Sequence, residues 1–163
     1  MDVQQSRVMV MEQKRKRLMF EIPGEAVPKA RPRVVTVRGK NMTFTPDKTK
    51  SFENLVKLMY VNQCKDQKLD GPISATIHIF RSIPKSTSKK NRACWLMGRF
   101  PVTTKGDCDN YAKAVLDSLN GIAYNDDAQV AELYVTKEYS DKPRTMVILR
   151  EIENIGIENL EGW

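Results

Sequence analysis

Four aspartates and a lysine lie within one short run near the middle of the chain. Asp107 and Asp109 open the run, Asp126 and Asp127 close it, and Lys113 follows Asp109 by about one helical turn. A carboxylate set without histidine or cysteine ligands is typical of a site for a hard cation such as Mg²⁺ or Mn²⁺. A cation held there would polarise a phosphoryl oxygen and lower the pKa of a bound water, as phosphodiester hydrolysis requires. The lysine would orient that water or offset charge that develops on the phosphorus.

Each of these features also has an ordinary structural explanation. Asp107 or Asp109 alone is a common N-cap residue. An Asp109–Lys113 pair on a helix surface is a usual ion pair that contributes about 0.3–0.5 kcal/mol. Asp126 and Asp127 alone suit a turn. The spacing therefore leaves both the metal site and these explanations open.

An amphipathic helix over residues 109–120 is expected to position this run. Gly121 should end the helix, because glycine is favoured just beyond a helix C-terminus. Asp109, Lys113 and Asp117 recur at i, i+4 spacing along one side of it. The opposite, core-facing side carries Ala112, Val115, Leu116 and Leu119.

The remaining pattern predicts a single α+β domain with a mixed β-sheet and two main helices. The other main helix is expected to run from an N-cap at Thr45 to about Cys64, with Pro46 in its first turn. Its core-facing stripe comprises Phe52, Leu55, Val56, Met59 and Gln63. Apolar and β-branched alternation predicts strands at 18–23, 34–37, 42–45, 72–81 (a central strand), 130–139 and 144–152. A Gly39-Lys40-Asn41 turn is expected between the second and third strands.

The composition of the 163-residue chain favours a polyanionic partner. The formal net charge is +7 and the pI is about 9.4, which suits nucleic acid or an anionic membrane surface. No apolar run is long enough to span a membrane, and no signal-peptide core is present. Three unclustered cysteines and a single histidine, His78, argue against a disulfide framework, a zinc site and Ser-His chemistry. No organic cofactor is expected.

Two segments, residues 27–45 and 82–105, concentrate basic residues and contain no acidic residue. The first is interpreted as a phosphate track on a hairpin, with an ordinary surface hairpin as the alternative. The second is expected to be a long irregular flap that contacts DNA, with plain disorder as the alternative. Within it, residues 93–97 are expected either to form a short helix or to dock on a partner. The candidate DNA contacts are Lys29, Arg31, Arg33, Lys85, Lys89, Lys90 and Lys105.

The motifs of the chain resemble those of a known family. GDCDN, a lysine four residues after its second aspartate, AVLDSLNG and then AYNDDAQV occur in the order found in the RusA family of Holliday junction resolvases, often carried by phages and prophages. VPKARPRV, FTPDKT and the Pro84-Lys85-Ser86 opening of the basic loop also match, so the resemblance covers about Phe20 to Glu151. The sequence differs from the usual pattern at Gly106 and Cys108, and neither difference removes a ligand.

The resemblance implies a small homodimer that binds four-way DNA junctions and nicks two opposed strands with Mg²⁺, for which Mn²⁺ can substitute. By position, the family's metal-binding aspartates correspond to Asp107, Asp109 and Asp127, and its catalytic lysine corresponds to Lys113. Asp126 matches the first aspartate of the family's DD pair and is a further candidate ligand. The expected location is the cytoplasm of a bacterial cell, whether the protein is encoded by a phage or by its host.

The expected boundaries are a basic leader at 1–17, a nuclease domain at 18–152 and an acidic tail at 153–163. Three rival functions stay open: a nuclease for flaps or forks, a non-catalytic protein that binds branched DNA, and a basic domain that binds another protein through residues 93–97. The junction binding of a non-catalytic protein would be sensitive to salt and independent of Mg²⁺ chemistry. A non-catalytic protein would not require the four aspartates to lie close together.

Overall fold

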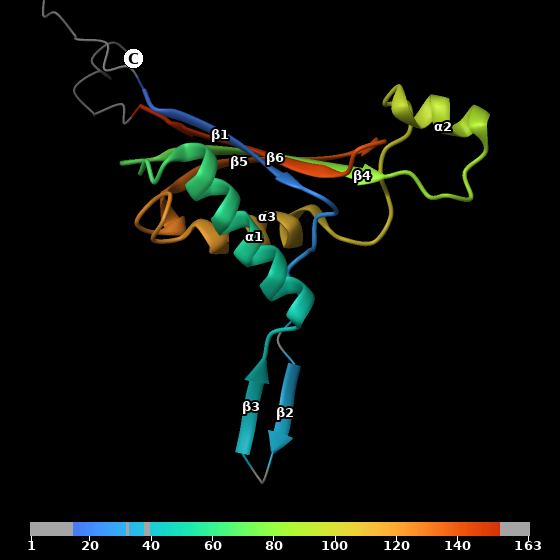
Figure 1. Ribbon diagram of the computed structural model, residues 1–163. Coiled ribbons are helices and arrows are strands. Elements are labelled where there is room, and N and C mark those ends of the chain that lie inside the picture. The colour runs from blue at the N-terminus through green and yellow to red at the C-terminus, as the bar shows by residue number, and fades with distance from the viewer. Residues whose placement is uncertain (1–14, 32, 38–39, 154–163) are drawn as a thin grey trace, which may run out of the picture.

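The structure, a computed structural model, describes residues 15–31, 33–37 and 40–153, except the side chains of residues 33, 35, 37 and 40–44 (Figure 1). The strands are β1 (Arg17–Pro23), β2 (Arg33–Val37), β3 (Lys40–Phe44), β4 (Ile73–Ser82), β5 (Val130–Ser140) and β6 (Arg144–Glu151). The helices are α1 (Asp47–Cys64), α2 (Lys89–Leu96) and α3 (Cys108–Leu119), with a 3₁₀ turn, η1 (Asp127–Gln129), before β5. The chain is α+β, as predicted, and α2 is a short third helix beside the two main ones.

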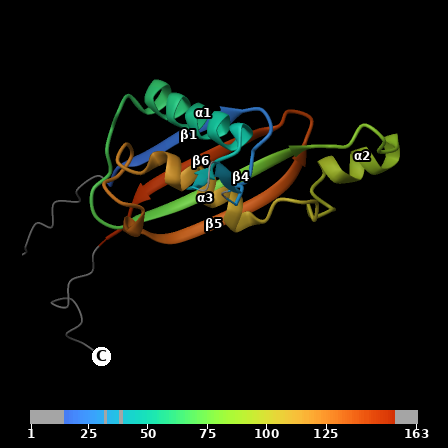
Figure 2. The same ribbon diagram turned by 90° about the horizontal axis from the view of Figure 1, so that it is seen from below.

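A mixed four-stranded sheet organises the domain. Its strands lie in the order β1-β6-β4-β5, with β4 parallel to β5 and antiparallel to β6. β5 and β6 follow one another in the chain, but β4 lies between them (Figure 2). β4 is therefore a central strand, as predicted. β5 is an edge strand, and no strand of the described chain pairs with its outer side.

Alternation along the strands places the core on one face of the sheet. Buried and exposed residues alternate strictly in β1, and β4 buries residues 73, 75, 77 and 79 on the side that α1 and α3 cover (Figure 2). The four predicted apolar residues of α3 are buried there, together with Phe52 and Val56 of α1. Removing this apolar surface from water is the main favourable contribution to folding, at about 25 cal/mol per Å².

Three local predictions need correction. Pro46 rather than Thr45 occupies the N-cap of α1, because the backbone of Pro46 is still extended (ψ 141°). Gln63 does not face the core; its side chain is exposed, and its amide nitrogen donates to the carbonyl of Glu21 (2.7 Å). In the hairpin, Lys40 pairs with Val37 and Asn41 with Thr36, so neither is a turn residue as predicted, and residues 38 and 39 lie outside the described part.

The segment of residues 82–105 is not irregular throughout, contrary to the prediction, because it contains α2. Ser88 caps this helix by accepting a hydrogen bond from a backbone N–H group in its first turn (3.3 Å). Trp95 stacks on Tyr139, with ring centroids 4.4 Å apart, which holds α2 against the end of β5. Of the two alternatives stated for residues 93–97, the structure shows the short helix.

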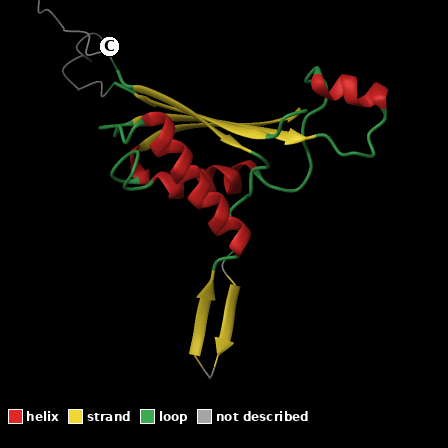
Figure 3. Ribbon diagram, viewed as in Figure 1, coloured by secondary structure: helices red, strands yellow, loops and turns green. Residues whose placement is uncertain are grey.

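The β2–β3 hairpin and α2 both extend away from the sheet and its two covering helices (Figure 3). The described ends of the chain lie together at one end of the sheet, where Arg15 donates to Glu153 (2.6 Å). Most of the predicted leader and tail, residues 1–14 and 154–163, lies outside the described residues. No helix in the described ranges is long and apolar enough to cross a membrane.

Candidate active site

The first acidic pair lies at the N-terminal end of α3. Asp107 occupies the N-cap position, yet its carboxylate makes no capping hydrogen bond. Asp109 lies in the first turn, and both side chains are exposed. The dipole of the helix favours negative charge at this end. Capping therefore does not account for Asp107, and both carboxylates are available to a ligand.

The loop before α3 is held by two basic residues of the sheet. Lys137 of β5 donates from Nζ to the carbonyl of Gly106 (2.9 Å). Arg81 of β4 donates to the carbonyl of Lys105 (3.2 Å) and to the hydroxyl of Tyr111. These bonds fix the peptide that leads into the acidic pair. Lys137 and Arg81 were not among the predicted site residues, although each is a basic residue at an inward-facing position of its strand.

Gly106 is required by the packing of this loop. Its φ of +109° lies in a region that residues with a Cβ rarely adopt. A Cβ at this position would lie 2.5 Å from two ring carbons of Tyr111. Burial raises the pKa of Tyr111, although Arg81 opposes this effect. The close approach of the loop to the ring accounts for glycine at a position where the sequence differs from the usual family pattern.

Lys113 lies one turn beyond Asp109 on the exposed side of α3. In the described part of the chain, no ion pair joins these two residues. A surface salt bridge therefore does not explain the pair. The ammonium group is free to face an anion that approaches the acidic pair.

The second acidic pair lies beyond the other end of α3. The carboxylate of Asp126 accepts a hydrogen bond from the backbone N–H of Ala128 (2.8 Å), and Gln129 Oε1 accepts one from the backbone N–H of Asp126 (3.2 Å). Asp126 thus performs the turn chemistry that was its alternative explanation. Asp127 is exposed.

One chain does not bring the two acidic pairs together. α3 has 12 residues, so its ends lie about 18 Å apart at 1.5 Å per residue. Gly106 is bonded near the C-terminal end of β5, whereas Gln129 precedes its N-terminal end and donates to the carbonyl of Gly71 (2.8 Å). Among the residues that the structure describes, no three His, Cys, Asp or Glu side chains are grouped to hold a metal ion. The aspartates have the right donor chemistry for Mg²⁺, but their predicted convergence does not occur within a single chain.

Lys29 has an internal role. Its side chain is 25% exposed, and its ammonium group binds the carboxylates of Glu53 and Asp117, the latter at 3.0 Å. Burial lowers the pKa of Lys29, but the hydrogen bonds to these two carboxylates raise it further, so the net shift is upward. Its backbone N–H donates to the carbonyl of Asn110 (2.8 Å). Lys29 therefore joins α1, α3 and the base of the hairpin, and its charge is already neutralised, which counts against the expected DNA contact.

The other candidate DNA contacts lie on the two basic segments. Each segment has one end beside the start of α3: the backbone of Lys29 is bonded to Asn110, and Lys105 directly precedes Gly106. Arg31 is exposed at the base of the hairpin, and the side chain of Arg33 lies outside the described residues. Three exposed lysines lie at or before the start of α2: Lys85, Lys89 and Lys90. Lys105 is exposed and directly precedes Gly106. DNA held by both segments would therefore pass close to the first acidic pair.

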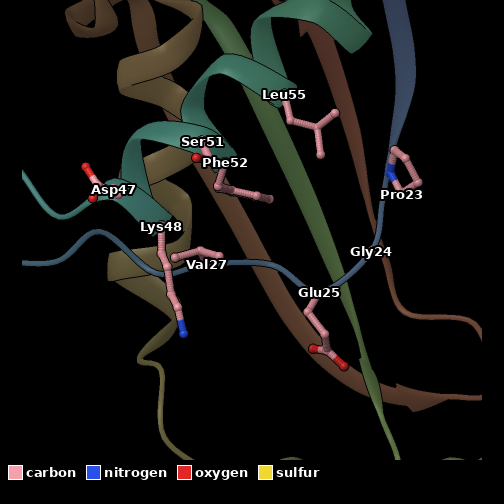
Figure 4. Close-up of a pocket in the computed structure, with 9 residues that line it drawn as sticks. All are labelled: Pro23, Gly24, Glu25, Val27, Asp47, Lys48, Ser51, Phe52 and Leu55. Carbon is pink, nitrogen blue, oxygen red and sulfur yellow. The ribbon is translucent and has the colours of Figure 1, made fainter.

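A separate pocket of about 450 Å³ lies between α1 and the chain that follows β1 (Figure 4). It is lined by Pro23, Gly24, Glu25, Val27, Asp47, Lys48, Ser51, Phe52 and Leu55. None of the predicted site residues is among them. Glu25 is moreover engaged by Arg81, whose Nε donates to it (3.0 Å). The pocket is therefore distinct from the candidate site.

Residues 23–150 match the family described as Endodeoxyribonuclease RusA. The chain belongs to this family. It is also similar to the uncharacterized protein YqaN of Bacillus subtilis (strain 168), with 39% identity over 137 residues that cover 83% of this chain and 96% of the relative. The family match includes the acidic run and both basic segments, so it confirms the resemblance and makes the chain a member of a DNA endonuclease family.

Proposed function

We propose that this protein is a structure-selective endodeoxyribonuclease that resolves Holliday junctions in DNA recombination and repair. Its reaction would be hydrolysis of phosphodiesters in two opposed strands. The observation that carries the proposal, beside family membership, is the placement of Asp107 and Asp109 where both basic segments reach α3. A basic surface collects a polyanion, whereas a focused carboxylate pair repels it unless a cation intervenes.

The cation in this proposal is Mg²⁺, with Mn²⁺ as a substitute. Carboxylate oxygens are the ligands that such hard cations prefer. Asp107, Asp109 and Asp127 are the proposed ligands, and Asp126 is less suited because its carboxylate caps η1. A bound ion would polarise the scissile phosphate. Lys113 would neutralise charge that develops on that phosphate.

The proposed partner is four-way branched DNA, bound by a homodimer in the cytoplasm of a bacterial cell. Two opposed nicks in a two-fold symmetric junction need two sites that are related by the same symmetry. The exposed basic residues of the two segments would neutralise backbone phosphates and set the register of the DNA.

Cleavage of matched substrates tests this proposal. Purified protein is incubated with a mobile four-way junction, a flap, a fork and a linear duplex of related sequence, each with Mg²⁺ or EDTA. The junction should be cut fastest, and only with Mg²⁺. Faster cleavage of the flap or fork would favour a flap or fork nuclease instead. Junction binding without cleavage, in Mg²⁺ and also when Mn²⁺ replaces it, would favour a non-catalytic branched-DNA-binding protein.

A further inference from the structure

The end of α2 and the turn that follows it present large apolar side chains to solvent. Leu96, Met97 and Phe100, here called the apolar tip, are 42%, 70% and 49% exposed. Exposed apolar residues that are scattered singly are normal and need no explanation. These three occur within five consecutive residues of an element that extends away from the sheet (Figure 3). They therefore form a local apolar surface suited to a partner.

The helix behind the apolar tip is held in place by the sheet. Trp95 stacks on Tyr139 of β5 and contacts Phe100, with ring centroids 4.4 and 6.1 Å away. Arg92 forms an ion pair with Asp141, which lies in the turn between β5 and β6. A surface that is already fixed loses little conformational freedom when a partner binds. The structure thus fixes α2 on the sheet and leaves its apolar tip exposed.

The charges around the apolar tip identify a polyanion as its partner. The segment of residues 82–105 contains six basic residues and no acidic one. In the described part of the chain, Arg92 is the only one of the six that forms an ion pair. A protein partner would need a matching acidic rim around an apolar centre. DNA has both, because its base faces pack on apolar and aromatic side chains and its phosphates pair with cations.

The base faces of DNA are accessible only where stacking is interrupted. In a continuous duplex each base is covered by its neighbours, and unstacking one step costs a few kcal/mol. This cost is least where a base is already unpaired or unstacked. Phe, Leu and Met are among the apolar side chains that proteins insert between base steps. An apolar tip of these three residues therefore favours a branch point over a continuous duplex.

α2 and the first acidic pair are attached to the same end of β5. Tyr139 contacts Trp95, and Lys137, two residues earlier, holds the carbonyl of Gly106. Alternate residues of a strand lie on the same face, about 7 Å apart. Gly106 directly precedes Asp107. DNA that rests on the apolar tip is therefore also brought to the start of α3.

We propose that the apolar tip packs against base faces at the crossover of branched DNA and thereby distinguishes a junction from a continuous duplex. Phe100 stacks on a base, and Leu96 and Met97 fill the space where the next base pair would lie. The exposed lysines of the segment bind the flanking phosphates. The inference rests on the proposed nuclease function and names the residues that select its substrate.

Binding measured in EDTA tests this inference without relying on cleavage. Joint replacement Met97→Ser and Phe100→Ser should weaken binding of a four-way junction about tenfold or more, and binding of a linear duplex less than about twofold. The slope of log affinity against log salt should not change, because no cation is removed. Phe100→Trp, which keeps an aromatic ring, should retain the preference for the junction. Leu58→Ser, at a leucine 53% exposed on α1, is the control and should change neither affinity.

A fluorescent base at the crossover reports the contact directly. 2-Aminopurine replaces an adenine there, and its emission depends on stacking. Saturating wild-type protein should change this emission, whereas the variant with serine at both Met97 and Phe100 should not when the junction is equally saturated. The same probe inside a linear duplex should not respond to either protein.

The outcomes separate this inference from the proposed function. If wild-type protein binds junctions selectively but cuts none, the proposed function fails, while loss of selectivity in the double variant still supports the inference. If wild-type protein cuts junctions and the double variant keeps the full preference for them, the inference is overturned and the apolar tip is left to a protein partner. Equal binding of junction and duplex by the wild-type protein would also overturn it.

Discussion

Replacing Gly106 by alanine should destabilise the fold and disturb the first acidic pair. The φ of +109° costs a residue with a Cβ about 1–3 kcal/mol. The added methyl group would lie 2.5 Å from two ring carbons of Tyr111, so the ring must move. The buried hydroxyl of Tyr111 would then lose its bond to Arg81, at a further cost of about 1–2 kcal/mol. The free energy of unfolding should therefore fall by about 2–5 kcal/mol.

Urea unfolding measures this loss, and two further variants identify its cause. Gly121→Ala is the matched control, because its φ is +76° but no atom lies within 4 Å of an added Cβ. It should cost about 1 kcal/mol, from the backbone alone. In a Tyr111→Ala background, Gly106→Ala should cost less, since the clash is gone. A loss for Gly106→Ala no larger than that for Gly121→Ala would refute the argument that the ring of Tyr111 requires glycine here.

Three other outcomes follow from the structure. Lys29→Met should lower the free energy of unfolding by about 1–3 kcal/mol in the urea assay, because it leaves two carboxylates close together without a cation. As a control, Arg15→Met removes an exposed ion pair and should lower it by less than about 0.5 kcal/mol. Joint replacement of Lys89 and Lys90 by alanine should weaken junction binding and reduce the slope of log affinity against log salt by about 2, as measured by gel shifts at several salt concentrations. Burial raises the pKa of Tyr60 from 10.0 to about 12. The stability that its neutral hydroxyl contributes is therefore fully present below pH 10 and is lost between pH 10 and 12. Tyr60→Phe should reduce this loss of stability at alkaline pH in unfolding measurements.

Elements with strong periodicity could be predicted from the sequence. α3 has apolar residues at helical spacing on one side and charged residues on the other, and the structure buries the predicted side. β4 alternates in the same way and lies in the centre of the sheet, as predicted. In both cases the pattern within the segment itself determines which face is buried.

Features that depend on distant residues could not be predicted. The insertion of β4 between β5 and β6 leaves no local signal, because a short connection suggests a hairpin. α2 lacks an apolar stripe, and its position depends on the contact of Trp95 with Tyr139 in a different element. Gln63 was assigned to the core because it follows Met59 at i, i+4 spacing, whereas the buried residues of this part of α1 are its neighbours Tyr60 and Cys64.

The candidate active site also depends on contacts between distant residues that the sequence does not reveal. The two acidic pairs are close in sequence, but the 12-residue helix between them holds its ends apart, so short spacing did not mean proximity in one chain. Lys29 and Arg31 read alike as basic residues of one segment. Only the structure shows that Glu53 and Asp117 neutralise Lys29, while Arg31 stays exposed.

Cleavage of a mobile four-way junction, labelled on two opposed strands, tests the central claim most directly. With Mg²⁺ the wild-type protein should produce paired nicks at symmetric positions, and EDTA should abolish them. Asp109→Asn should lose the nicks and bind the junction at least as tightly in gel shifts, because a carboxylate that repels phosphate has been removed. Wild-type protein that binds the junction but makes no nicks in Mg²⁺ or Mn²⁺ would contradict the claim.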